Sequence, residues 1–284
     1  MSRVGLLGAE RQAAVSFAES WPEKRFTFVT EQAVCDGWDL ENVEIVWGSV
    51  GQEIEGMSDR QIKVIPLCGE WLAATGGQPD NGIGSFGLYD VLGYLSGEFD
   101  EYVLGVTREP PPDVEWVLKG DLRHRPDMAI SGRPAEAMLY LDDPYGCGSL
   151  FQRKVETSTC YLVTGYREER DSVDLSVLKV HQEAFYREDF LLAAETVRDD
   201  ELVELSVAML DAIDQRGYFS MNWLGAAEGK LLTSLRPFPR AVFPVFAECG
   251  LNLVDRKSSG VNVVPAGIKL IGSANYSSYK EMGR

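Results

Sequence analysis

The residues best suited to chemistry in this sequence are cations that follow a short apolar run. Lys119 comes directly after the letters WVL, and a basic loop over residues 121–126 follows it. A lysine supplies a compact positive charge, whereas Arg123 and Arg125 present planar forks that suit phosphate or carboxylate groups. The grouping predicts a site for an anionic ligand. The alternative is that Lys119 ends a strand in solvent and the arginines belong to a solvated loop.

Two further polar groups lie later in the chain. Gln152 and Lys154 occupy alternate positions of an expected strand, so they would share one of its faces. Arg236 and Arg240 flank a segment with two prolines, which restrict the backbone and would hold these side chains in place. A surface turn explains the Arg-Pro segment nearly as well.

The first part of the chain predicts the β/α alternation that is typical of a parallel sheet. Apolar and β-branched runs bounded by glycine, aspartate and asparagine indicate the strands. We expect strands over residues 3–7, 25–29, 43–47 and 61–67, and helices over residues 9–19 and 86–95. The second helix would pack on this parallel sheet.

The composition changes at three consecutive prolines, residues 110–112, which predict a stiff connector and a boundary between domains 1–109 and 113–284. The segments that follow are spaced for an antiparallel sheet with hairpins. We expect strands over residues 115–118, 137–141, 149–155, 159–166, 218–224 and 230–235, and a charged hairpin tip over residues 167–170.

Two helices are predicted in this second part. A stripe of apolar residues over 199–216 begins at two aspartates and ends before Gly217, which are start and stop signals of a helix. A shorter helix over residues 246–253 would stop at Gly250. The chain thus predicts an α/β domain followed by an α+β domain.

Composition excludes several classes of protein. The sequence has 284 residues, with 27 lysines and arginines against 44 aspartates and glutamates, so its formal net charge is −17. Such a charge disfavours a nucleic-acid partner, because phosphate backbones need cations. The apolar runs are far shorter than the ~20 residues of a membrane span. Five scattered cysteines without a CxxC pair favour the reducing cytoplasm and disfavour a zinc site.

The order of these elements resembles the ATP-grasp superfamily over roughly residues 115–255. Lys119 falls where that family has a phosphate-binding lysine, and residues 151–155, FQRKV, fall on the hinge strand that holds adenine. Residues 218–240 and 246–253 match the terminal hairpin and helix. The resemblance implies a β/α domain followed by an ATP-grasp-like nucleotide-binding domain, with ATP clamped between sheets.

The resemblance also implies roles for the polar groups. Lys119 and Lys154 would contact the phosphates and Gln152 the adenine or its hinge, while Arg123 and Arg125 would help to bind the nucleotide. Arg236 and Arg240 would be the catalytic residues, facing the transferred phosphoryl group or a substrate carboxylate.

The hairpin departs from the family pattern for Mg²⁺, which uses two acids and an asparagine. The corresponding residues are Asn222, the one expected metal ligand, and then Ser234 and Arg236. A hydroxyl and a guanidinium cannot replace a carboxylate at a hard cation. Three explanations are open. Other nearby acids could hold the metal ion, or the match to the family could be wrong by a few residues. The third is that the metal site has been lost. The nearby acids are Glu228, Glu248 and Asp255.

The expected function is an ATP-dependent ligase that joins a small-molecule or peptide carboxylate to an amine through an acyl-phosphate, with ATP and Mg²⁺ as cofactors. Two alternatives remain open. One is a catalytically degenerate ATP-grasp-like protein that binds a nucleotide or a peptide. The other is an acidic α/β module that meets a basic protein partner.

Overall fold

The computed structural model describes part of the chain in detail. The described residues are 3–7, 25–29, 43–48, 63–66, 70–71, 87–120, 130–132, 149–156, 159–184, 187–237, 245–246, 248–251, 259–273 and 276–281. The predicted helix over 9–19 and the predicted strand over 137–141 lie outside these residues.

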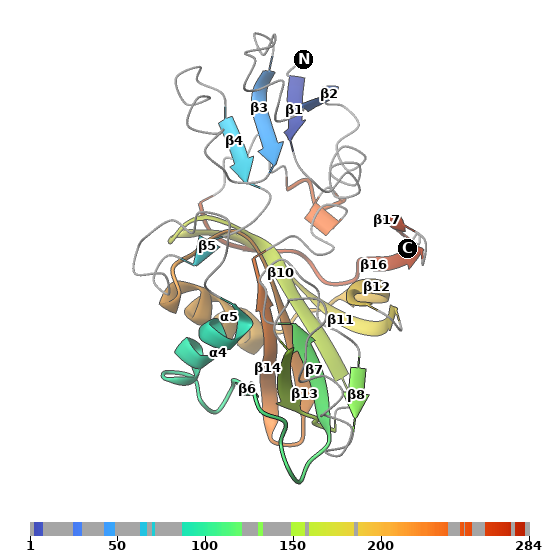
Figure 1. The fold of residues 1–284 in the computed structure, drawn as a ribbon. Helices are drawn as coiled ribbons and strands as arrows, with labels where there is room; N and C mark the ends of the chain where they lie inside the picture. Colours follow the sequence, from blue (N-terminus) through green and yellow to red (C-terminus); the bar gives the residue numbers. More distant parts are fainter. Residues whose placement is uncertain are drawn as a thin grey trace.

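The N-terminal strands form a parallel sheet, as the alternating pattern predicted. β1 (Arg3–Leu7), β2 (Arg25–Val29), β3 (Val43–Gly48) and β4 (Lys63–Pro66) lie in the order β2-β1-β3-β4. All three pairings are parallel. Figure 1 shows this sheet at the opposite end of the picture from β8.

The second part of the chain is built on a large, mainly antiparallel sheet. Its main path runs β14-β13-β10-β11-β12-β16-β17, with β15 beside β11 and β5 beside β13. The central strands are long, and most of their residues are paired with a neighbouring strand. Their bounds are β10 Thr159–Glu169, β11 Ser172–Ala184, β12 Arg187–Thr196, β13 Gln215–Ala226 and β14 Gly229–Arg236. The shorter ones are β5 Glu70–Trp71, β15 Gly260–Val263, β16 Lys269–Ser273 and β17 Tyr276–Glu281.

A small antiparallel sheet accompanies the large one. β6 (Val106–Thr107), β9 (Ser149–Arg153), β7 (Trp116–Gly120) and β8 (Ile130–Gly132) lie in the order β6-β9-β7-β8. Trp116 and Phe151 are buried in it and make an edge-to-face contact, with ring centroids 5.3 Å apart. This arrangement is the α+β organisation with hairpins that the sequence predicted.

Two helices, α4 (Leu88–Ser96) and α5 (Asp200–Ala212), cover one face of the large sheet (Figure 1). Their buried residues form one apolar cluster with strand residues such as Val163, Phe219, Met221 and Leu235. The prediction that the helix over residues 86–95 packs on the parallel sheet is therefore wrong. Its four buried residues, Leu88, Val91, Leu92 and Leu95, complete the core of the second part instead. The domain boundary at residues 110–112 stays a prediction, although α4 and β6 precede it and join this second unit.

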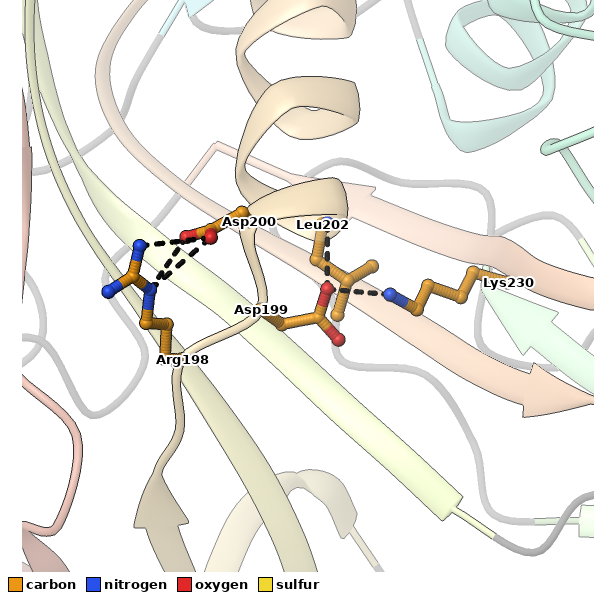
Figure 2. Close-up of polar contacts among 5 residues, drawn as sticks. All are labelled: Arg198, Asp199, Asp200, Leu202 and Lys230. Atoms are coloured by element: carbon orange, nitrogen blue, oxygen red, sulfur yellow. Dashed lines mark hydrogen bonds and ion pairs between the residues drawn. The ribbon is translucent and has the colours of Figure 1, made fainter.

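The start of α5 is held by charged side chains. The Asp199 carboxylate accepts a hydrogen bond from the Leu202 backbone N–H at 3.1 Å, which caps the helix. The same carboxylate lies 2.6 Å from the Lys230 ammonium of β14, so the helix is tied to the sheet (Figure 2). Lys230 also contacts Glu201 at 2.7 Å. These contacts explain why two aspartates in sequence mark the helix start.

α5 ends earlier than predicted. Asp214 adopts a left-handed conformation with φ of +45°, which turns the chain so that Gln215 begins β13. Gly217, the predicted stop signal, lies inside that strand with φ of +78°. The helical turn at Phe246 does end at Gly250, whose φ is +69°, and Leu251 N–H donates to the Phe246 carbonyl at 2.8 Å.

One irregularity interrupts the pairing of β13 with β14. Asn222 pairs with Ser234, but the next residue, Trp223, pairs with Leu232, so Thr233 is an extra residue on β14. The hairpin predicted around residues 225–229 is otherwise confirmed, with its turn between Ala226 and Gly229.

Candidate functional site

A row of buried polar side chains crosses the large sheet on the face opposite the helices. Thr164 of β10 pairs with Ser176 of β11 and with Ser220 of β13, and Ser220 pairs with Arg236 of β14. Directly paired residues share a face, and their neighbours Val163, Met221 and Leu235 point to the helices. We call this the polar row: Thr164, Ser176, Ser220 and Arg236, all at most 4% exposed.

The hydroxyl groups of the polar row are anchored to the strands. Thr164 Oγ1 donates to the Phe219 carbonyl at 3.0 Å, and Ser176 Oγ lies 3.4 Å from the Thr164 carbonyl. Side chains held in this way keep fixed positions. The face of the sheet is therefore rigid as well as polar.

Arg236 connects the polar row to the small sheet. Its Nη2 donates to the Gly120 carbonyl at 2.8 Å, and its side chain is only 3% exposed. Gly120 is the residue after Lys119 and the last of β7. Arg236 thus contacts the residue next to Lys119, although Lys119 and Arg236 are 117 positions apart in the sequence.

Lys119 and Gln152 share one face of the small sheet. Lys119 pairs with Leu150 and Val117 pairs with Gln152, and alternation then places all four on the same side. Leu150 belongs to the core of the large sheet, so this face is turned toward it. Lys119 is 5% and Gln152 2% exposed. The structure therefore brings Lys119, Gln152 and Arg236 to the junction of the two sheets.

The amide group of Gln152 is used within the fold. Nε2 donates to the Leu104 carbonyl at 2.7 Å and to the Thr233 carbonyl at 3.1 Å. Both donor hydrogens of the amide therefore hold β9 against the edge of the large sheet, while its carbonyl oxygen is the group left to meet a ligand.

The other predicted site residues lie elsewhere or outside the described part. Lys154 follows the last residue of β9, and its exposed ammonium lies 2.8 Å from Glu115. Gln152, by contrast, is buried, so the two side chains have different surroundings. Arg123, Arg125 and Arg240 lie outside the residues that the structure describes.

The base of the hairpin holds the three residues at the expected metal positions. Asn222 and Ser234 are direct partners across β13 and β14, and Arg236 lies two residues beyond Ser234 on the same face. Ser234 is fully buried, and its Oγ has no hydrogen-bond partner within the described part of the chain. In that same part, no group of three or more His, Cys, Asp and Glu residues could hold a metal ion.

A second buried arginine, Arg167, has a different environment. It lies on the helix side, where its Nη1 donates to the Leu210 carbonyl and its Nη2 to Asp211, each at 2.5 Å. Burial lowers the pKa of the Arg167 guanidinium, and the nearby Asp211 and Asp214 counteract this. A hairpin does form near the tip predicted over residues 167–170, but its turn is Arg170 and Asp171, while Arg167 is paired within β10 and packed inside the protein.

Sequence reasoning missed the hydroxyl members of the polar row. Thr164, Ser176 and Ser220 are each a small polar residue next to apolar residues of a strand. That pattern is a signal, because an isolated hydroxyl at a buried strand position needs a partner or a ligand. It does not reveal that the three lie in register, since they come from three strands.

The junction of the two sheets can bind an anion. Lys119 of the small sheet and Arg236 of the large sheet are both buried cations, and Arg236 contacts the residue after Lys119. The protein as a whole has a net charge of −17. Charged donors hold phosphate or carboxylate oxygens more strongly where water is excluded.

None of the described helices is long and apolar enough to span a membrane.

Comparisons with known proteins identify the fold. No protein-family model and no curated protein sequence matches the chain. Its structure is similar to that of an ATP-grasp superfamily protein from Archaeoglobus fulgidus, with a TM-score of 0.61, 14% identity, and coverage of 100% of this chain and 97% of that one.

Two enzymes of known reaction are also similar in structure. D-alanine–D-alanine ligase from Bacillus anthracis has a TM-score of 0.57 and 9% identity, with 88% of this chain and 92% of that one covered. N5-carboxyaminoimidazole synthetase from Staphylococcus aureus has a TM-score of 0.56 and 10% identity, with coverage of 95% and 81%. At these identities the likeness concerns the fold, and it shows that this chain has the fold of the ATP-grasp superfamily.

Proposed function

We propose that this protein binds ATP at the junction of its two antiparallel sheets and uses it to join a carboxylate to an amine. The observation that carries the proposal is that the buried Arg236 of the large sheet donates to the Gly120 carbonyl of the small sheet, next in sequence to the buried Lys119. A polyphosphate is the ligand class that such a pair suits best. The fold adds support, because two of its structural neighbours are by name a ligase and a synthetase.

The proposed reaction has two steps. A substrate carboxylate oxygen attacks the γ-phosphorus, and the bond from the γ-phosphorus to the β-phosphate oxygen breaks. ADP is released and an acyl-phosphate is formed. The amine nitrogen then attacks the acyl carbon, the bond to the phosphate oxygen breaks, and the nitrogen loses a proton. Phosphoryl transfer of this kind depends mainly on positioning and charge neutralisation.

This chain's residues would supply those two effects. Lys119 would neutralise the phosphates, and Arg236 would face the transferred phosphoryl group or the substrate carboxylate. Gln152 would hold β9 in the position where this strand contacts the adenine. Arg123, Arg125 and Arg240 remain candidates for further phosphate or substrate contacts. Lys154 has no place in the proposal, because its ammonium is exposed and paired with Glu115.

A second function, nucleotide binding without catalysis, is favoured by one observation. The hairpin carries Asn222, Ser234 and Arg236 where the family's acids and asparagine would lie. None of the three has a carboxylate that could hold a metal ion. Such a protein would bind ATP and regulate a partner.

Binding and turnover measured together test both functions. ATP affinity of the Lys119→Gln variant should fall about 10- to 100-fold, the loss expected for one hydrogen bond to a charged group. Lys179→Gln is the matched control, because Lys179 lies on the same face as Val177, which packs against the helices. Equal affinity for wild type and Lys119→Gln would refute the proposed site.

Turnover separates the ligase from the binder. Wild type is incubated with ATP and pairs of carboxylates and amines, while ADP is measured and hydroxylamine traps any acyl-phosphate as a hydroxamate. ADP release with hydroxamate formation supports the ligase. ATP binding with neither product supports the non-catalytic binder.

A further inference from the structure

The donor set at the base of the hairpin does not fit a magnesium ion. Asn222 and Ser234 offer an amide and a hydroxyl, and their neighbour Arg236 brings a positive charge. Protein-bound Mg²⁺ normally has one or two carboxylate ligands in addition to substrate phosphates. A guanidinium two residues from Ser234 would also repel a divalent cation.

The surrounding side chains on this face supply no carboxylate either. Leu162 pairs with Asn222 from β10, while Ser220 and Leu224 lie two residues away on β13. Apolar and hydroxyl groups therefore surround the position on the described strands.

The acids that could have replaced the missing ligands are not at this position. Glu228 lies in the turn of the hairpin, beyond the end of β13 at Ala226, which is four residues and so about 13 Å along the strand from Asn222. Its carboxylate is 3.4 Å from Arg153. Glu248 is exposed on the turn that ends at Gly250, and Asp255 lies outside the described residues.

The same position offers donors for an anion. The Ser234 hydroxyl is fully buried without a hydrogen-bond partner in the described chain, so it can donate to a ligand oxygen. Arg236, on the same face about 7 Å further along β14, has a planar guanidinium with five donor hydrogens, one of which goes to the Gly120 carbonyl. A phosphate group can accept hydrogen bonds from both.

We infer that the base of the hairpin binds the phosphates of its nucleotide directly, through Arg236 and Ser234, and does not hold a magnesium ion. The inference rests on the proposed binding of ATP and makes it more specific. A fixed guanidinium takes the place in charge neutralisation that a divalent cation would otherwise have.

The decisive experiment is a calorimetric titration of the full-length protein with ATP, in buffer with MgCl₂ and in buffer with EDTA. The dissociation constants in the two buffers should agree within about threefold. Arg236→Met should weaken binding about 10- to 100-fold in both buffers. Arg236→Lys, which keeps the charge but loses the fork, should retain part of the affinity.

A variant that restores acids provides the converse test. Asn222→Asp combined with Ser234→Glu should make binding depend on Mg²⁺, with at least about tenfold weaker affinity in EDTA. Glu228→Gln is the matched hairpin control and should behave as wild type in both buffers. If Arg236→Met does not fold, the wild-type comparison and the acidic variant still decide the question.

The failures of the two proposals differ. Wild-type binding that is more than about tenfold weaker in EDTA overturns this inference alone. Unchanged affinity of a folded Arg236→Met variant does the same. Absence of ATP binding in both buffers overturns the proposed function and this inference with it.

Discussion

Among the side chains that the structure describes, each face of the large sheet buries an arginine, and the two arginines have different neighbours. Arg167 contacts the last turn of α5, where Leu210 and Asp211 accept its hydrogen bonds. Arg236 contacts the Gly120 carbonyl of another sheet. The first guanidinium completes a helix end, which carries unsatisfied carbonyls and partial negative charge. The second joins the large sheet to the small one, at the position where we propose that ATP binds.

This difference shows that burial of a charge does not by itself identify a site. Both side chains are at most 3% exposed. What separates them is the element that each one contacts, and whether further buried polar residues share its face. Only Arg236 lies in register with a row of polar side chains.

The largest effect should come from the apolar face. Phe219→Ala removes a fully buried ring from the core beneath α4 and α5, and should lower the free energy of unfolding by about 3–5 kcal/mol. Urea denaturation measures this change. The protein that remains folded should bind ATP as wild type does. A loss below about 1 kcal/mol would mean that this face is not the stabilising one.

Arg167→Met should come next. It removes the partner of Asp211 and leaves the Leu210 carbonyl without its donor, for a loss of about 2–3 kcal/mol. Asp211 is 34% exposed, so water partly replaces the lost contact and the effect stays below that of a fully buried pair. ATP affinity should not change. A nucleotide-binding defect in this variant would erase the contrast between the two arginines.

Gly165→Ala should destabilise by about 2 kcal/mol through overpacking. A Cβ atom at this position would lie 2.1 Å from the Asp174 carbonyl oxygen and 2.9 Å from the Phe219 ring. Gly225→Ala is the control, because its Cβ would meet nothing closer than 3.5 Å. Thermal unfolding of the two variants compares them directly. Equal melting temperatures of the Gly165→Ala and Gly225→Ala variants would show that the close contacts of Gly165 with Asp174 and Phe219 do not require a glycine.

The smallest effect concerns Lys230 at the start of α5 (Figure 2). Burial alone would lower the pKa of Lys230, but hydrogen bonds to Asp199 and Glu201 outweigh it, so the pKa is raised. The folded protein therefore binds this proton more tightly than the unfolded chain does. The stabilisation is complete below the ordinary lysine pKa of about 10.4 and is lost as the pH rises through the folded value.

Lys230→Met should accordingly cost about 1 kcal/mol near neutral pH, with a smaller difference from wild type at strongly alkaline pH. Urea denaturation at the two pH values measures it. Arg198→Met provides the control, because Arg198 is exposed and contacts only Asp200 in Figure 2. A difference that does not shrink at alkaline pH would exclude the ammonium as its cause.

Local signals predicted much of the fold because they are strong where turns and caps occur. The hairpin of β13 and β14 and the start of α5 follow from Gly229 and Asp199. β11 and β12 were missed, since charged residues such as Asp174 and Lys179 interrupt their apolar pattern. These strands form because they have partners on both sides, which is information that no local window contains.

The site was predicted in part for the same reason. Lys119 and Arg236 stand out as cations next to apolar strands or prolines, and their types alone suggest an anion. Their meeting depends on how two sheets pack. The sequence did not show that Gln152 is buried while the Lys154 ammonium, two residues on, is exposed and paired with Glu115.

The extra residue on β14 has a consequence for how the two sheets are joined. Without Thr233, Asn222 would still face Ser234 and Trp223 would still face Leu232, so both faces of the large sheet would keep their composition. What would vanish is the carbonyl that accepts the Gln152 amide. The extra residue thus serves both structures: its hydroxyl donates to the Asn222 carbonyl of β13 at 3.2 Å, and its own carbonyl is an attachment point for the neighbouring small sheet.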